Sequence, residues 1–335
     1  MNNQSIPLVS VTRGGLVECV HRGHIAVVDA EGRAVASAGE PAFATYARSA
    51  AKLLQAVPVV ASGAAARFGL DASELALLCA SHNGEEQHVE AVARILAKLG
   101  LAEDALQCGA HPPYHKASAA KLRDSGERPR AVHNNCSGKH AGMLALAKHL
   151  GASLDDYKRP DHPVQRAMLA SYASFAGVAE ADVVLGVDGC GVPVYGAPLA
   201  SLALAYARLG APRADGPEAD ACRAVVSALR AHPEMLAGTD RFDTELIRVT
   251  RGRIVGKMGA EGVFAVTVPD EGLGLALKIE DGAQRALYPA VVEALLRLGW
   301  IDAAEGEGLA AYHRPPIHNW GGDEVGAIVP AFDLR

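Results

Sequence analysis

The sequence has few aromatic residues, few cysteines and no long apolar or basic run. Only 5% of its 335 residues are aromatic although half are hydrophobic, so its core must be built mainly from aliphatic side chains. The net charge is −6 and no run of Lys or Arg forms a stripe that could follow phosphates, which argues against a nucleic-acid partner. No apolar stretch approaches membrane-spanning length, so we expect no membrane partner.

The first ten residues, MNNQSIPLVS, lack the basic and apolar regions of a signal peptide. The sequence therefore predicts a cytoplasmic protein. Six cysteines in a chain of this size lack the density of a disulfide-stapled secreted domain. Most are expected to be reduced core thiols, and an unusual one is a ligand or catalyst candidate. The six are Cys19, Cys79, Cys108, Cys136, Cys190 and Cys222.

Strand patterns occur near both ends of the chain, and helical patterns fill its middle. Residues 17–39 alternate β-branched and polar residues around His21-Arg22-Gly23 and Ala30-Glu31-Gly32-Arg33, which predicts three strands joined by two hairpin turns. Helical patterns span residues 47–57, 73–79, 86–99, 117–124, 137–150, 164–176, 199–209, 218–232 and 285–298. Further strand patterns span residues 182–187, 253–255, 263–269, 273–279 and 325–329.

This order predicts the α/β class, with an α/β/α sandwich whose antiparallel sheet is built from both termini around a helical middle. The sequence contains no repeat, no low-complexity segment and no linker that would divide it. We therefore expect one domain over residues 1–335, with a helical subregion at about residues 45–179.

A serine and a lysine in the motif Ser49-Ala50-Ala51-Lys52 stand three residues apart, on one face of an expected helix. A neutral lysine there could take the serine proton and make the hydroxyl a nucleophile. The same four letters recur as Ser118-Ala119-Ala120-Lys121, so spacing alone does not identify the site. The apolar run after Lys52 indicates burial, which favours a neutral amine, whereas charged residues follow Lys121.

Two further short motifs follow in the order expected of serine acylases with a β-lactamase-like fold. They are Ser81-His82-Asn83, an S-x-N element, and Lys257-Met258-Gly259, a K-x-G element. Ser81 could relay a proton, and Lys257 could supply a second cation that keeps Lys52 neutral. The separation between Ser49 and Ser81 is shorter than expected of β-lactamases.

Two polar segments contain cysteines that lead to the hypothesis of a metal site. Cys136 and His140 lie four residues apart at the expected start of a helix, and Cys190 lies in the glycine-rich loop that follows Asp188. Ordinary ligand chemistry favours these two cysteines with His140 for zinc, leaving a position open for water. Buried, unligated cysteines are the alternative on sequence alone.

Taken together, these motifs resemble the asparaginase II family of the Rhizobium etli type. The resemblance extends through His232-Pro233-Glu234-Met235, Arg241-Phe242-Asp243-Thr244 and Asn319-Trp320-Gly321-Gly322, and so covers nearly the whole chain. It implies hydrolysis of L-asparagine to L-aspartate and ammonia on a fold like that of β-lactamases and penicillin-binding proteins. It also implies a homodimer and a Zn²⁺ site.

The resemblance implies roles for particular residues. Two serine–lysine pairs serve the active site, Ser49 with Lys52 and Ser81 with Lys257. Zinc would be held by Cys136, Lys139 and Cys190, so the resemblance replaces His140 by the neighbouring lysine. The substrate-binding candidates are Arg48, His82, Asn83 and Asp188.

Two other functions stay open at this stage. One methylene of substrate length is worth only about 1–3 kcal/mol of discrimination, so a glutaminase or a broader serine acylase on the same fold is one alternative. A non-catalytic protein that binds zinc or an amino acid is the other.

Overall fold

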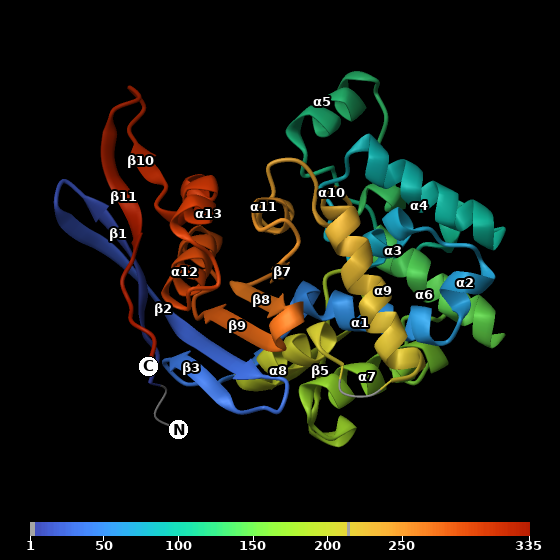
Figure 1. Cartoon of the computed structure of the whole chain (residues 1–335). Coiled ribbons are helices and arrows are strands. Elements are labelled where there is room, and N and C mark those ends of the chain that lie inside the picture. The colour runs from blue at the N-terminus through green and yellow to red at the C-terminus, as the bar shows by residue number, and fades with distance from the viewer. Residues whose placement is uncertain (1–3, 213–214) are drawn as a thin grey trace. The chain divides into compact units, whose positions relative to one another are not determined.

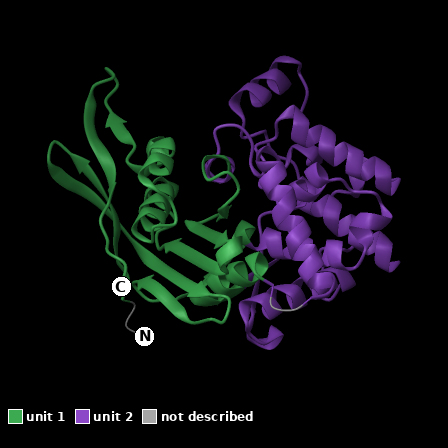
Figure 2. Cartoon of the chain, viewed as in Figure 1, with its two compact units in different colours: residues 1–50, 196–211, 248–335 green, residues 51–195, 212–247 purple. Residues whose placement is uncertain are grey.

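The computed structural model of the chain describes residues 4–212 and 215–335. The chain forms two compact units (Figure 2). Unit 1 comprises Met1–Ala50, Gly196–Ala211 and Arg248–Arg335, and unit 2 comprises Ala51–Tyr195 and Pro212–Ile247. Each unit is therefore assembled from segments that are far apart in the sequence.

Unit 1 is built on an antiparallel sheet with strands from both ends of the chain (Figure 1). Its strand order is β10-β11-β1-β2-β9-β8-β7, and β3 also pairs with β2. In the central pair, Gly23 of β2 lies opposite Ile279 of β9. The strands are β1 (Ile6–Arg13), β2 (Leu16–Asp29), β3 (Ala34–Ala38), β7 (Val255–Gly259), β8 (Val263–Val268), β9 (Leu273–Ile279), β10 (Pro316–His318) and β11 (Glu324–Pro330).

Two helices of unit 1, α8 (Leu199–Gly210) and α12 (Gln284–Arg297), cover opposite faces of this sheet. Successive strand residues alternate between faces. Thr267 of β8 lies against Gly210 of α8, and Phe264 of the same strand makes an edge contact with Tyr288 of α12 at 6.3 Å between ring centroids. The predicted α/β/α arrangement with a sheet from both termini is confirmed in this unit.

The remaining elements of unit 1 are short. The 3-10 helix η1 (Arg48–Ala51) contains most of the first S-x-x-K motif, and β4 (Ala44–Tyr46) pairs antiparallel with the end of β6 (Pro193–Pro198). Two short helices, α13 (Ala303–Gly308) and α14 (Ala310–His313), follow α12, and η5 (Pro269–Glu271) joins β8 to β9.

Unit 2 is mainly helical, and α1 packs at its centre against α6, α7 and α9. Three of its helices end at glycines with positive φ, Gly100, Gly151 and Gly177, because only glycine adopts this conformation freely. The helices are α1 (Lys52–Ala61), α2 (Ala64–Arg67), α3 (Ala72–Leu78), α4 (Glu86–Leu99), α5 (Lys116–Asp124), α6 (Ser137–Leu150), α7 (Pro163–Ala176), α9 (Pro217–Ala231) and α10 (Pro233–Leu236), with η2 (Glu103–Ala105), η3 (Ala131–His133) and η4 (Glu180–Asp182). Strand β5 (Val184–Val187) precedes the loop with Asp188 and Cys190, and α11 (Phe242–Val249) begins in unit 2 and ends in unit 1.

One strand prediction is wrong. The expected turn at residues 21–23 does not form, because β2 continues from Leu16 to Asp29. Gly23 is needed there for close strand packing, since a Cβ would lie 2.1 Å from the carbonyl oxygen of Lys278. The first turn lies instead at Gly14 and Gly15, both with positive φ. The turn near residues 30–33 is confirmed, and Gly32 there has a φ of 83°.

Among the described residues, no helix is both long enough and apolar enough to cross a membrane.

Candidate functional site

Ser49 lies in η1 of unit 1, directly after a strained residue. Arg48 has a φ of 49°, in the left-handed region that non-glycine residues rarely adopt. Such a conformation costs about 1–3 kcal/mol and is found most often at functional sites. The Arg48 guanidinium lies 3.9 Å from the Glu261 carboxylate, which helps to hold this segment. Ser49 itself is half-buried.

Strand β7 passes close to the Ser49 segment within unit 1. A Cβ on Gly259 would lie 2.7 Å from the carbonyl oxygen of Ala47 and 3.3 Å from Cβ of Arg48, so no side chain larger than hydrogen fits there. The same strand contains Lys257, which is completely buried and donates from Nζ to the carbonyl oxygen of Met258 at 2.8 Å. Unit 1 thus keeps one serine and one lysine of the predicted site on neighbouring segments.

The other serine and lysine meet in unit 2. Lys52 is completely buried, and its Nζ donates to the Ala80 carbonyl oxygen at 2.6 Å and to Ser81 Oγ at 3.0 Å. Ser81 is held in turn by its backbone N–H, which donates to the Leu236 carbonyl oxygen at 3.0 Å. By contrast, Lys121 of the second S-x-x-K motif is exposed. The expected difference in burial between the two lysines is therefore present.

His82 is buried, and both of its ring nitrogens have protein partners. Its Nδ1 accepts the backbone N–H of Gly84 at 3.2 Å, so Nε2 carries the proton and donates to Ser137 Oγ at 2.8 Å. Ser137 Oγ donates to the Val132 carbonyl oxygen at 3.0 Å. Burial keeps the pKa of His82 well below its usual value. A neutral imidazole therefore ties the Ser81 loop to the start of α6.

Glu85 fixes the end of the same loop. Its Oε1 accepts from Asn83 Nδ2 and from the Thr239 backbone N–H, both at 2.8 Å. Burial on its own would raise the pKa of Glu85, but these hydrogen bonds lower it to about 2. Asn83 Oδ1 is buried and has no hydrogen-bond partner among the residues that the structure describes.

Cys136, Lys139 and Cys190 form a buried cluster in unit 2. Cys136 directly precedes α6 and Lys139 lies in its first turn, while Cys190 is supplied by the loop after β5. Lys139 Nζ donates to Cys190 Sγ at 3.0 Å, and the thiol of Cys136 lies within reach of the same sulfur and of Asn135 Oδ1, which is 3.6 Å away. All three residues are at most 5% exposed.

The hydrogen bonds of this cluster separate the two thiols chemically. The hydrogen bond from Cys136, together with the charge of Lys139, lowers the pKa of Cys190 to about 4 although burial opposes the shift. The same hydrogen bond and burial raise the pKa of Cys136 to about 12. Burial would lower the pKa of Lys139, but Cys190, Cys136 and Asp188 raise it above its usual value. Cys190 is thus a thiolate beside an ammonium group and a thiol donor.

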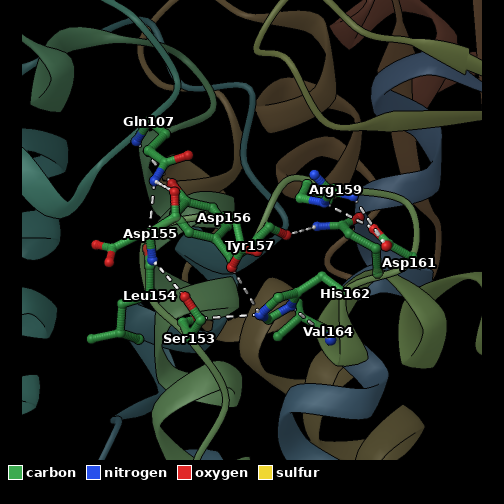
Figure 3. A network of polar contacts seen from close by, with 11 residues as sticks. Gln107, Ser153, Leu154, Asp155, Asp156, Tyr157, Arg159, Asp161, His162 and Val164 are labelled. Carbon is green, nitrogen blue, oxygen red and sulfur yellow. Dashed lines mark hydrogen bonds and ion pairs between the residues drawn. The ribbon is translucent and has the colours of Figure 1, made fainter.

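His140, the sequence-based alternative to Lys139, is bonded away from this cluster. Its Nδ1 lies 2.7 Å from the hydroxyl of Tyr157, which accepts the backbone N–H of Gln107 at 2.8 Å. Nε2 of the same ring is buried and has no hydrogen-bond partner among the described residues. The loop that positions Tyr157 is itself cross-linked through Gln107, Asp155 and His162 (Figure 3).

The donor set of the cluster fits a zinc ion by its chemistry. Thiolates and a neutral amine are nitrogen and sulfur ligands of the kind that zinc takes, although lysine is an uncommon one. Among residues 4–212 and 215–335, no group of three or more His, Cys, Asp or Glu side chains is placed to hold a metal. Any zinc site here therefore requires the lysine in addition to the two cysteines.

The predicted site residues are divided between the two units. Arg48, Ser49 and Lys257 belong to unit 1, and the others belong to unit 2. Sequence reasoning missed Glu85, Ser137 and Tyr157. The first two lie inside motifs that had been singled out, whereas no sequence signal pointed to Tyr157.

Of three comparisons with known proteins, one identifies a family. No curated protein sequence matches the chain. Among solved structures, a β-lactamase from Mycobacterium bovis is similar, with 14% identity and a TM-score of 0.41 over 82% of this chain and 93% of that chain. The model of the L-asparaginase II family matches residues 9–330. The chain therefore belongs to the L-asparaginase II family.

Proposed function

We propose that this protein hydrolyses L-asparagine to L-aspartate and ammonia, with Ser49 as the nucleophile. Family membership supports asparagine hydrolysis in general. The observation that carries the finer proposal is the buried Lys52, whose Nζ lies 3.0 Å from Ser81 Oγ. Because Lys52 follows Ser49 by three residues, the amine that contacts one serine of the site is close in sequence to the other.

In the proposed reaction, neutral Lys52 accepts the proton of Ser49 as Oγ attacks the side-chain amide carbon. Backbone N–H groups stabilise the negative oxygen that forms. The carbon–nitrogen bond then breaks as the proton held by Lys52 passes through Ser81 and Lys257 to the nitrogen, which leaves as ammonia. Water attacks the resulting aspartyl ester and gives one proton to Lys52, which passes it to Ser49 Oγ as the ester bond breaks.

Asparagine also has an ammonium and a carboxylate group that must be oriented. We assign this role to Arg48, His82, Asn83 and Asp188. Support is strongest for Asn83, because its buried Oδ1 has no hydrogen-bond partner among the described residues and could accept a substrate N–H. His82 acts by holding the loop, since both of its nitrogens have partners.

Zinc is part of the proposal, with Cys136, Lys139 and Cys190 as its ligands and Asp188 near it. The ion would supply positive charge that polarises or positions a substrate oxygen. Binding it requires Cys136 and Lys139 to lose their protons, because metal ligands must be deprotonated. His140 is left out of the set, because the described residues hold no group of three His, Cys, Asp or Glu side chains placed for a metal.

An ammonia-release assay with asparagine and glutamine tests this function. We expect faster release from asparagine, and loss of activity in Ser49→Ala. Ser201→Ala is a matched control, because Ser201 is a half-buried serine of the same unit. Full activity in a folded Ser49→Ala protein would contradict the nucleophile assignment.

Other results of the same assay lead to the alternatives. Preference for glutamine would indicate a glutaminase, and no activity on either amide would favour a zinc-binding or amino-acid-binding protein. A cytoplasmic location and a homodimer stay predictions, and size-exclusion chromatography with light scattering tests the dimer.

A further inference from the structure

A cavity lies in unit 2, among α4, α5 and η3, outside the proposed catalytic residues. Its volume is about 320 Å³, within the range of small-molecule sites. Ser118 and Lys121 of the second S-x-x-K motif line it, together with His133. The repeated motif therefore faces a concave surface of its own.

One part of the cavity lining is negatively charged and lacks a cation. The cavity is lined by Glu86, Glu90 and Glu127. Among the described residues, only Glu86 has an ion-pair partner, Lys121 at 3.2 Å. Two carboxylates are thus left to bind a positively charged group of a ligand.

The same lining also presents hydrogen-bond donors. His133 is 7% exposed, and its Nδ1 accepts the Arg130 backbone N–H at 2.9 Å. The proton therefore resides on Nε2, which has no hydrogen-bond partner in the described part of the chain. A ring N–H that lines a cavity and has no protein acceptor is available to donate to a ligand oxygen.

Lys121 can join His133 in binding that oxygen. Its ion pair with Glu86 joins two side chains that are 76% and 73% exposed. Such an exposed pair contributes little to stability, so a ligand carboxylate could replace Glu86 at little cost. The lining also includes the apolar side chains of Val89, Pro113 and Leu122.

We propose that this cavity is a second binding site, for a zwitterionic α-amino acid with a short aliphatic side chain. Glu90 and Glu127 bind its ammonium group, Lys121 and His133 bind its carboxylate, and Val89 with Leu122 contacts its side chain. This site is independent of the reaction proposed above.

The cavity is nevertheless connected to the Ser81 loop. Gly84, which lines it, has a φ of 78°, and a Cβ there would lie 2.9 Å from Cβ of Pro113. At the start of α5, the His115 backbone N–H donates to the Asn83 carbonyl oxygen at 2.8 Å. A ligand in the cavity would thus contact segments that also fix Asn83.

Isothermal titration calorimetry with L-norvaline tests the site, using butylamine and pentanoate as probes that keep only one charged group. We expect norvaline to bind with a millimolar or lower Kd and each probe to bind at least tenfold more weakly. Binding of butylamine or pentanoate as tight as that of norvaline would overturn the zwitterion assignment.

Variants locate the binding. Glu90→Gln combined with Glu127→Gln should weaken norvaline at least tenfold, as should Lys121→Gln. The matched controls are Asp124→Asn and Lys116→Gln, which remove the same charges from α5 residues outside the cavity lining. Unchanged affinity in the cavity variants, or no binding by the wild type, would overturn the proposal. A failure to hydrolyse asparagine would not overturn this proposal, because norvaline binding is measured without turnover.

Discussion

Replacing Lys52 by methionine separates its catalytic role from its structural one. Methionine has a similar length and no charge, so the substitution removes the amine while keeping most of the volume. Lys52 Nζ has two partners, the Ala80 carbonyl oxygen and Ser81 Oγ. An acceptor left unsatisfied in a buried site costs about 1–3 kcal/mol.

The opposing contribution comes from desolvation. A fully buried amine has lost its hydrogen bonds to water, a cost of about 1–3 kcal/mol that an apolar side chain of similar volume avoids. The two effects are of similar size, so we expect the free energy of unfolding of Lys52→Met to differ from the wild type by no more than about 2 kcal/mol.

The catalytic effect should be much larger. Loss of a general base lowers the rate about 10²–10⁴-fold, which corresponds to about 3–5 kcal/mol of transition-state stabilisation. Ammonia release from asparagine measures kcat, and thermal unfolding measures stability on the same sample. Lys116→Met is the control, because Lys116 is an exposed lysine. A folded Lys52→Met protein with a kcat within tenfold of the wild type would refute Lys52 as the base.

Three further predictions concern the cluster of Cys136, Lys139 and Cys190, the Ser81 loop and strand β7. Cys136→Ser and Cys190→Ser should each lose zinc while Cys222→Ser, another buried cysteine, retains it; elemental analysis decides, and stoichiometric zinc in either ligand variant would disprove the ligand set. The pKa of Glu85 is lowered from 4.5 to about 2. The stability that its ionised carboxylate contributes is therefore present above pH 4.5 and is lost as the pH falls towards 2. With allowance for solvent screening, Glu85→Gln should lower the free energy of unfolding in urea by about 1–2 kcal/mol at pH 7. Near pH 2 the variant should match the wild type. An equal loss at both pH values would contradict the role of the ionised carboxylate. Gly259→Ala should lower the free energy of unfolding by about 1–3 kcal/mol through overpacking and should lower kcat as well. An unchanged free energy of unfolding would show that β7 has room for a methyl group at this position.

The sequence predicted best those elements that have clear local boundaries. The bounds expected for α4 and α6 match the structure because each helix ends at a glycine with positive φ, Gly100 or Gly151. Strand β1 was missed, and β2 was divided by an expected turn at residues 21–23. The conformation of Gly23 depends on the Lys278 carbonyl oxygen of β9, and no local pattern can reveal so distant a neighbour.

For the site, local sequence could indicate burial but not partners. The apolar run after Lys52 correctly predicted a buried lysine. The choice between Lys139 and His140 could not be made from spacing, because it depends on which side chain reaches the sulfur of Cys190, and Lys139 Nζ does so at 3.0 Å. The cavity beside Ser118 was equally beyond reach, since its lining is drawn from separate stretches between Gly84 and His133.

The discontinuous make-up of unit 1 has a consequence for synthesis on the ribosome. Gly23 of β2 pairs with Ile279 of β9, and Val9 of β1 pairs with Pro330 of β11. Translation proceeds at about 5–20 residues per second, so these N-terminal strands wait on the order of 10–50 seconds for their partners. During that interval their open edges can pair with other chains. We therefore expect the yield of folded protein in cells to depend on growth temperature and chaperone supply, and to depend on them more strongly than the stability of the folded protein alone predicts.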